Sequence, residues 1–274
     1  MIKLLERLSI LFPDSSRTTL KEWISQGRIS LGGRILKSPD LLIQETAVPT
    51  LSPKKKFAPL GIEILYEDRD IVVVEKPEGL LSVGTPYQKE KCLHTILKRR
   101  HHRTQVFPVH RLDKETSGIL VFAYTIKARD VLKKLFEKHD LLREYQAVVY
   151  GTPSPAEGTW EHRLFEDARF YVHVSENGKL ATTHYRTLAS HGNMSLLSIR
   201  LETGRKNQIR VQSAASGHPL VGDPKYGKKD DPHKRLYLHA CFLSFHHPLT
   251  GKTLSFTSSF HFDLKNIHIG VIHT

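Results

Sequence analysis

Cysteine is scarce in this chain of 274 residues, which contains only Cys92 and Cys241. No CxxC pair exists, so neither a cysteine-bound metal nor a disulfide framework is expected. Because apolar residues follow each cysteine, we expect two reduced and buried thiols. The 17 histidines are scattered, and adjacent pairs such as His101 and His102 cannot both face one metal ion from a regular element. The sequence therefore predicts no metal site.

Long hydrophobic runs are also missing, and no segment approaches the length of a membrane span. The apolar start of the chain, residues 1–12, is interrupted by Lys3, Glu6 and Arg7. Its leucines recur at helical spacing, which favours a packed amphipathic helix over a signal peptide. We therefore expect a cytoplasmic protein with no membrane partner.

Acidic residues are outnumbered, with 28 Asp and Glu against 41 Lys and Arg, a net charge of +13 and a pI near 9.7. A basic excess of this size is typical of proteins with a polyanionic partner such as nucleic acid. Residues 1–59 hold ten basic and five acidic residues, so the excess is spread along the chain. A generally basic surface would give the same totals, and charge alone favours nucleic acid only modestly.

Prolines and lysines concentrate in residues 49–60, which contain three prolines and three consecutive lysines. This composition predicts an extended, basic linker. The chain then divides into a small domain over residues 1–48 and a large domain over residues 61–274.

The small domain is predicted to contain two helices and a hairpin. The first helix covers residues 2–12, and Ser15 or Ser16 caps the second, which stops near Gly27. Residues 29–35 contain a Gly-Gly pair between two short apolar stretches, which predicts a tight β-hairpin.

Short strands dominate the large domain. The apolar run over residues 71–74 is typical of a strand buried on both faces, and residues 126–138 place apolar side chains along one face of a helix. Because no regular βαβ alternation occurs, the pattern predicts an α+β domain with a largely antiparallel, mixed sheet. The strand candidates are residues 62–66, 71–75, 118–124, 145–150, 181–188, 194–201 and 236–245.

The segment His110-Arg-Leu-Asp-Lys-Glu-Thr-Ser-Gly118 bears most directly on function. Taken alone, it is a polar loop in which Asp113 caps a turn. It resembles the signature of the RluA family of pseudouridine synthases, which reads His-Arg-Leu-Asp, two variable residues, Thr-Ser-Gly. Further segments resemble other motifs of that family, in the expected order and together over roughly residues 60–260. They are residues 66–80 around Lys76-Pro77, residues 143–151 around Tyr145, residues 203–210 with 217–220 and 222–227, and residues 238–240 with 247–248.

The resemblance implies an enzyme that breaks the bond between ribose carbon and base nitrogen, turns the base, and rejoins it through carbon. It implies that Asp113 is the nucleophile and that Arg210 pairs with this carboxylate. Tyr145 matches a tyrosine that stacks on the target base, and Arg111 matches a residue that enters the RNA when the base leaves. An isomerisation needs no redox partner, so no cofactor is expected.

Residues 1–48 resemble the small RNA-binding module first seen in a ribosomal protein, the S-four type. Two helices and a hairpin of this type present basic side chains to a phosphate backbone. Besides Arg111, the residues expected to lie in RNA-binding regions are Arg17, Lys21 and Arg28 in this module, and Lys76 and Arg205 in the large domain.

Two departures from the family pattern leave some contacts open. The family often has His where this chain has Asn207 and Gln212, so the RNA-facing contacts of that segment are undetermined. Structured RNA is the expected substrate, with large-subunit ribosomal RNA ahead of transfer RNA, and a monomer is the default expectation. The RNA base that is modified depends on loop shape, which the sequence does not reveal.

Two alternatives remain open. A non-catalytic RNA-binding protein explains the charge and the small domain, but not the motif set. A hydrolase or phosphotransferase with Asp113 as nucleophile would need a Gly-rich phosphate loop or a metal cluster, and neither is found. A glycosidase-like mechanism would need a second carboxylate, for which Glu115 is the candidate.

Overall fold

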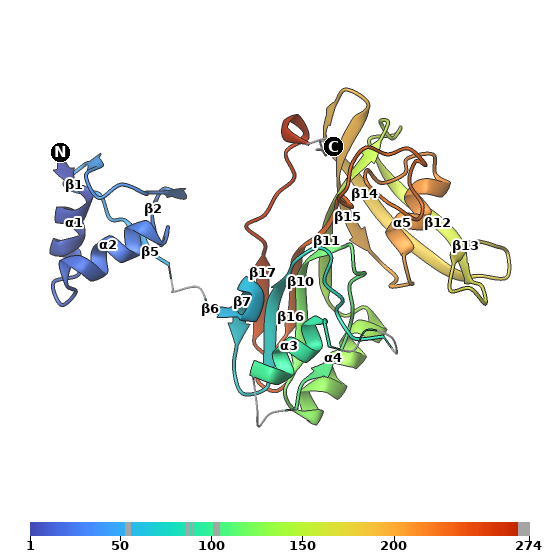
Figure 1. Ribbon diagram of the computed structural model, residues 1–274, viewed down its shortest axis with the longest axis horizontal. Helices are drawn as coiled ribbons and strands as arrows, with labels where there is room; N and C mark the ends of the chain where they lie inside the picture. The colour runs from blue at the N-terminus through green and yellow to red at the C-terminus, as the bar shows by residue number, and fades with distance from the viewer. Residues whose placement is uncertain (53–55, 86–87, 89, 101–104, 268–274) are drawn as a thin grey trace. The chain divides into compact units, whose positions relative to one another are not determined.

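Figure 1 shows the protein as a computed structural model, which describes residues 1–52, 56–85, 88, 90–100 and 105–267. The chain divides into two compact units, Met1–Lys56 and Phe57–Thr274. Each unit contains buried apolar side chains that form a core within it. Within the described ranges, no helix has the length and apolar composition that a membrane span requires.

Two helices supply part of the core of the first unit. Helices α1 (Leu4–Leu11) and α2 (Arg17–Ser25) bury Leu4, Leu8, Leu20 and Ile24 in a shared core. Ser16 caps α2, because its hydroxyl accepts a hydrogen bond from the backbone N–H of Thr19 at 3.2 Å. The predicted second helix and its cap are therefore confirmed.

Short strands complete the first unit. Strands β2 (Ile29–Leu31) and β3 (Arg34–Ile35) form the predicted hairpin. The first helix begins later than predicted, because β1 (Ile2–Lys3) is extended and pairs with β4 (Leu42–Ile43). Pairing with a distant strand is not visible in the local leucine spacing from which the helix was predicted.

The predicted linker over residues 49–60 differs from the structure at both ends. Strand β5 (Thr50–Leu51) pairs with β2 in the first unit, and β6 (Lys56–Ala58) lies at the edge of the large sheet. Residues 53–55 lie outside the described ranges. The prolines flank β5 without interrupting it, and Leu51 packs against the core of the first unit, so this strand is stable despite its composition.

The second unit is built on a mixed sheet in which twelve strands are described, in the order β13-β12-β14-β15-β11-β16-β10-β8-β7-β6, with β17 beside β16 and β9 beside β10. The pair β10–β16 is parallel, and the other pairs with a described register are antiparallel. The prediction of an α+β fold on a largely antiparallel sheet is therefore confirmed. The remaining bounds are β7 (Ile62–Glu67), β8 (Ile71–Lys76), β9 (Phe107–Pro108), β10 (Ser117–Ala123), β11 (Leu142–Tyr150), β12 (Glu157–Glu166), β13 (Val172–Val174), β14 (Lys179–His191), β15 (Met194–Leu201), β16 (Leu238–His246) and β17 (Thr253–Thr257), with short 3₁₀ helices η1 (Pro59–Gly61) and η2 (Leu264–Asn266).

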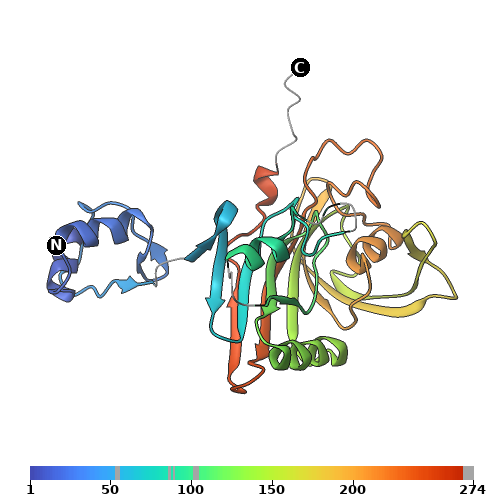
Figure 2. The same ribbon diagram turned by 60° about the horizontal axis from the view of Figure 1, so that its bottom comes forward.

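Helices cover both faces of the sheet around β8 and β10. Helix α3 (Leu93–Arg100) packs in the same core cluster as Val72, whereas α4 (Ile126–Lys138) packs in the cluster that contains Val73. Neighbouring residues of a strand point to opposite faces, so the two helices lie on opposite sides. Figure 2 shows both helices against this part of the sheet. The predicted burial of residues 71–74 on both faces is confirmed.

Helix α5 (Gln208–Ala215) lies against the other end of the sheet, beside β12 and β14 (Figures 1 and 2). Its Val211 packs with Leu164, Val172 and Ala181 of the strands. All six residues from Gln208 to Ser213 are buried, and four of them are polar. The segment therefore has no apolar stripe, and its helix was not predicted from periodicity.

Candidate active site

The signature loop, residues 110–118, follows β9, runs into the start of β10 and carries Asp113. Buried side chains fix the residues on both sides of Asp113. The Ser82 hydroxyl donates to the carbonyl of Leu112 at 2.7 Å and accepts from its N–H at 3.0 Å. The Lys76 ammonium donates to the carbonyl of Lys114 at 3.2 Å. The backbone around the candidate nucleophile is thereby held from two neighbouring residues.

Lys76 is therefore an interior residue, and the expectation that it takes part in RNA binding is wrong for direct contact. Its side chain is fully buried and also donates to the carbonyls of Pro77 at 3.0 Å and Leu80 at 2.8 Å. Burial lowers its pKa to about 8, although the charges of Asp113 and Glu115 act in the opposite direction. Sequence alone did not reveal that carbonyl groups would solvate this lysine at the end of a buried strand.

The signature loop ends where β10 meets β16 in parallel register. Gly118 pairs with Ala240 and has φ +120°, and a Cβ atom there would lie 2.3 Å from the Ala240 oxygen. Next to it, Arg235 donates to the Ser117 hydroxyl at 2.9 Å, and that hydroxyl shares a hydrogen bond of 2.8 Å with Nδ1 of His239. Burial lowers the pKa of His239 to about 4, so the imidazole stays neutral. Two of the sequence motifs are thus joined by packing and hydrogen bonds.

Arg210, on the first turns of α5, links the signature loop to a buried carboxylate. Its Nε and Nη2 donate to the two oxygens of Asp223 at 2.8 and 2.7 Å. Its Nη1 donates to Oδ2 of Asp113 at 3.2 Å and to Glu115 at 3.3 Å. Burial by itself lowers the pKa of the Arg210 guanidinium. The hydrogen bonds and negative charge of Asp223, together with the charges of Asp113 and Glu115, outweigh burial and raise this pKa above its ordinary value.

Asp223 was not assigned a role from sequence, and Glu115 was named only as the second carboxylate of a glycosidase-like alternative. Asp223 lies in the segment 222–227 that resembles a family motif, and this position in a motif could have marked it as a site residue. Glu115 occupies a variable position of the signature and offered no such signal. Because Glu115 pairs with the same guanidinium nitrogen as Asp113, the two carboxylates share one cation.

The two departures from the family pattern have different positions. Asn207 donates from Nδ2 to Oδ2 of Asp113 at 2.6 Å. Gln212 is fully buried and donates to the carbonyls of Trp160 and Ala181, both at 2.9 Å. Gln212 thus ties β12 to β14 and does not face RNA, whereas Asn207 contacts the candidate nucleophile.

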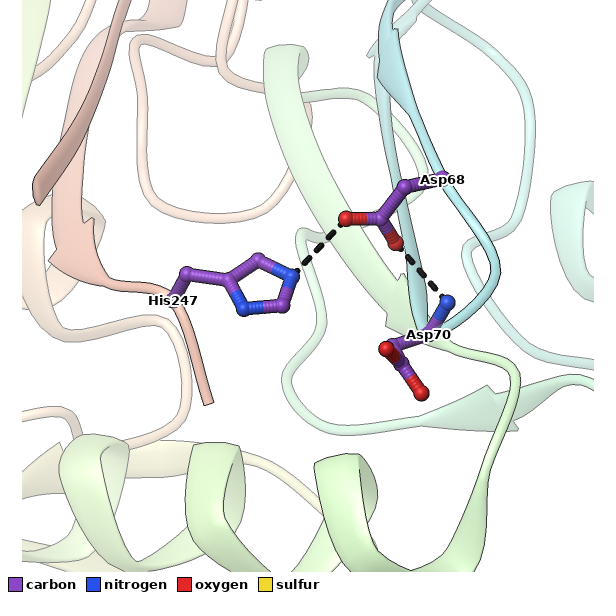
Figure 3. A group of neighbouring side chains, drawn as sticks. All are labelled: Asp68, Asp70 and His247. Carbon is purple, nitrogen blue, oxygen red and sulfur yellow. Dashed lines mark hydrogen bonds and ion pairs between the residues drawn. The ribbon is translucent and has the colours of Figure 1, made fainter. Parts of the chain in front are cut away.

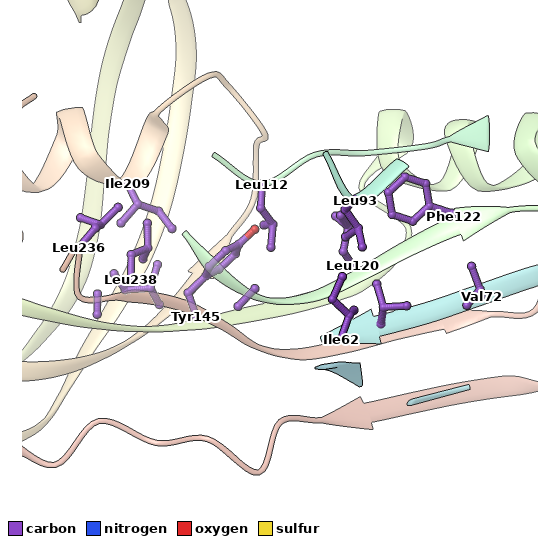
Figure 4. Packing of buried hydrophobic residues seen from close by; sticks show 14 of the residues in the cluster. Ile62, Val72, Leu93, Leu112, Leu120, Phe122, Tyr145, Ile209, Leu236 and Leu238 are labelled. Atoms are coloured by element: carbon purple, nitrogen blue, oxygen red, sulfur yellow. The ribbon is translucent and has the colours of Figure 1, made fainter. Parts of the chain in front are cut away.

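Tyr145 lies on β11 and is only 8% exposed. Figure 4 shows it among Leu112, Ile209 and Leu238, with its hydroxyl directed toward Leu112. Burial raises the pKa of the phenol, so it is protonated at neutral pH. Its side chain also lines a pocket, so packing in the core and exposure to a ligand are combined in one residue.

That pocket brings together residues far apart in the sequence. It is lined by Arg111, Leu112, Asp113, Thr116, Tyr145, Leu201, Arg205, Asn207, Gln208, Ile209, Arg210 and Leu238. Asp113 keeps 22% of its side chain exposed. Arg111 is exposed and has no hydrogen-bonding partner among the described residues, while exposed Arg205 donates to the carbonyl of Leu180 at 3.1 Å. The structure thus unites Asp113, Tyr145 and Arg210 with two of the predicted RNA-binding arginines.

The other predicted RNA-binding residues belong to the first unit. Arg17 and Lys21 are exposed on α2, one helical turn apart. Arg28 is partly buried, because its guanidinium lies 5.4 Å from the centre of the Trp23 ring and donates to the carbonyl of Ser52 at 2.9 Å. All three roles in RNA binding remain predictions.

Among the described residues, Asp68, Asp70 and His247 form a group with the composition of a metal site (Figure 3), and none of the three lines the pocket. Nδ1 of His247 accepts from two backbone N–H groups, so Nε2 carries the hydrogen and donates to Asp68 at 2.8 Å. The other oxygen of Asp68 accepts from the backbone N–H groups of Asp70 and Ile71. These hydrogen bonds join the β7–β8 turn to the end of β16 and account for the group as a structural link.

Comparisons with known proteins agree with this geometry. The profile of the RNA pseudouridylate synthase family matches residues 70–215. Ribosomal large subunit pseudouridine synthase D of Vibrio cholerae is 35% identical over 272 residues, which cover 90% of this chain and 84% of that protein. The protein of the same name from Escherichia coli K12 is 33% identical over 277 residues, 90% of this chain and 83% of its own.

Solved structures show the same fold. Human RNA Pseudouridylate Synthase Domain Containing 1 aligns with a TM-score of 0.62 at 25% identity, over 72% of this chain and 82% of that chain. Human RNA Pseudouridylate Synthase Domain Containing 4 gives a TM-score of 0.61 at 25% identity, over 72% of this chain and 88% of that chain. The resemblance drawn from the motifs is confirmed: the chain belongs to the RNA pseudouridylate synthase family and is an RluA-type isomerase of uridine in RNA.

Proposed function

We propose that this enzyme converts uridine to pseudouridine in ribosomal RNA of the large subunit, with Asp113 as the nucleophile. The observation that supports this most directly is the chain of contacts from Asp113 to Arg210 to Asp223. It leaves one partly exposed carboxylate in a pocket, oriented by a buried guanidinium that a second carboxylate fixes. The non-catalytic alternative is not favoured, because it gives this arrangement no purpose.

In the proposed reaction, the Asp113 carboxylate attacks ribose C1′ and the C1′–N1 bond breaks, with the electron pair leaving on the uracil. The uracil turns and C5 attacks C1′, which releases the carboxylate. The proton on C5 is then lost and N1 gains one, so the reaction is a net isomerisation. Arg210 offsets the carboxylate charge and orients it. The Tyr145 ring provides a stacking face for the base, and its neutral phenol is able to donate a proton.

Large-subunit ribosomal RNA is the proposed substrate because two proteins named ribosomal large subunit pseudouridine synthase D, from Vibrio cholerae and Escherichia coli K12, are similar to this chain over 90% of its length. The first unit holds 56 of the 274 residues, so coverage of 90% has to include part of it. We assign phosphate contacts to Arg17, Lys21 and Arg28 in this S-four-like unit, and contacts near the target uridine to Arg111 and Arg205.

We also propose that the enzyme acts as a monomer. Activity on ribosomal RNA also supports the cytoplasm as the place where the enzyme works. Neither proposal requires a cofactor, since the reaction is a balanced isomerisation.

The proposal is tested with transcripts that carry tritium on uracil C5, because that hydrogen is lost when C5 bonds to the sugar. We expect release from large-subunit ribosomal RNA and much less from transfer RNA. Release from transfer RNA alone would contradict the proposed substrate. Release from neither RNA would contradict the proposed activity.

A further inference from the structure

We infer that Asn207 is a positioning residue, which holds Asp113 so that Oδ1 is the attacking oxygen. This inference rests on the proposed role of Asp113 as the nucleophile. Oδ2 accepts from Asn207 at 2.6 Å and from Arg210 at 3.2 Å. Two donors occupy the two lone pairs of that oxygen. No donor to Oδ1 occurs among the described residues, so its lone pairs remain free for attack.

The orientation of the Asn207 amide is fixed by Tyr226. The backbone N–H of Val172 donates to the Tyr226 hydroxyl at 3.2 Å, so the hydroxyl hydrogen is available to Oδ1 of Asn207, 3.3 Å away. With its oxygen engaged there, the amide presents its NH₂ group to Asp113. The opposite orientation would place two oxygens 2.6 Å apart and would be repulsive.

The backbone at Asn207 supports the same assignment. The residue has φ +52° and ψ +21°, in the left-handed region that asparagine adopts more readily than most residues other than glycine. It stands at the N-cap position of α5, yet its side chain makes no capping hydrogen bond. The side chain therefore does not cap the helix, and it donates a hydrogen bond to Asp113 instead.

The chemistry of an amide suits this task. Its N–H groups do not titrate in the physiological range, so the hydrogen bond to Asp113 does not depend on pH. It adds no formal charge, and Arg210 remains the cation that offsets the carboxylate. Asn207 therefore helps to fix the orientation of the Asp113 carboxylate, and Arg210 supplies the positive charge that offsets it.

The test is Asn207→Gly, because glycine keeps φ +52° without strain and removes only the amide. We expect the single-turnover rate of tritium release to fall about 10- to 100-fold, as for loss of a hydrogen bond to a charged group, while the Kd for RNA changes less than about threefold. Tyr226→Phe should give a smaller loss. Asn193→Gly, an exposed asparagine in the β14–β15 turn, should match the wild type.

An unchanged rate in Asn207→Gly would overturn the inference, and so would a loss of RNA affinity equal to the loss of rate. A second readout needs no substrate: crystal structures of Asn207→Gly and Asn193→Gly. We expect the Asp113 carboxylate to rotate or occupy several conformers only in Asn207→Gly, and an unchanged Asp113 would also contradict the inference. If the wild type modifies neither RNA but Asp113 moves as expected, the proposed substrate fails and the positioning role stands.

Discussion

Basic residues on helix α2 of the first unit and basic residues in the interior of the second unit have opposite surroundings. On α2 of the first unit, Arg17 and Lys21 are exposed and have no partner among the described residues. In the second unit, Lys76 and Arg210 are buried, and carbonyls or carboxylates occupy their donors. A count of charges treats these residues alike. The comparison teaches that interior cations build the site around Asp113, whereas surface cations are free to contact phosphates.

Among the variants that test this comparison, Arg210→Ala is expected to have the largest effect on stability and turnover. The variant would leave Asp223, whose side chain is fully buried, without its partner. Breaking a buried ion pair costs about 3–5 kcal/mol of unfolding free energy, and turnover should be lost with it. Urea unfolding followed by circular dichroism measures the stability. Arg205→Ala, an exposed arginine five residues away, serves as the stability control and should lie within about 0.5 kcal/mol of the wild type.

Lys76→Met tests the interior cation through pH. The folded pKa of Lys76, about 8, is below its ordinary value of 10.5, so between these values the unfolded chain binds more protons than the folded one. Wild-type stability should therefore rise with pH relative to Lys76→Met, by about 2 kcal/mol between pH 7 and pH 9.5. Urea unfolding of both proteins at the two pH values provides the measurement. Parallel pH profiles would mean that burial does not shift this lysine.

The smallest effect is expected from the double variant Arg17→Ala/Lys21→Ala. Removal of two phosphate contacts should weaken RNA binding several-fold and reduce the slope of log K against log salt by about 0.7–0.9 per contact, without altering the single-turnover rate at saturating enzyme. The matched control is Lys133→Ala/Lys134→Ala on α4, which packs on the opposite face of the sheet from Tyr145. Equal salt slopes for the two double variants would contradict phosphate binding by the first unit.

Local patterns in the sequence predicted part of this molecule. The apolar face of α4 and the strand β15 gave correct bounds, because each carries a clear periodicity. The segments that contain Asp113, Tyr145 and Arg210 were found as motifs, and the structure brings all three to one pocket. These features are encoded by residues near one another in the chain.

Features that depend on distant residues were not predicted. Helix α5 was missed because four of its six buried residues are polar; one of them, Gln212, is satisfied by carbonyls on β12 and β14. Lys76 was assigned to RNA, since its burial and its contact with the distant carbonyl of Lys114 arise only in the fold. The same reason explains why Asn207 was recorded only as a departure from a family pattern.

The most direct test of the central claim compares Asp113→Asn with the wild type, by measuring RNA affinity and single-turnover tritium release on the same transcript. If Asp113 is the nucleophile and surface cations supply affinity, the rate should fall by about 10³-fold or more while the Kd stays within about threefold. Equal losses of affinity and rate would show that Asp113 supports the structure or the RNA contact, and would contradict its role as the nucleophile.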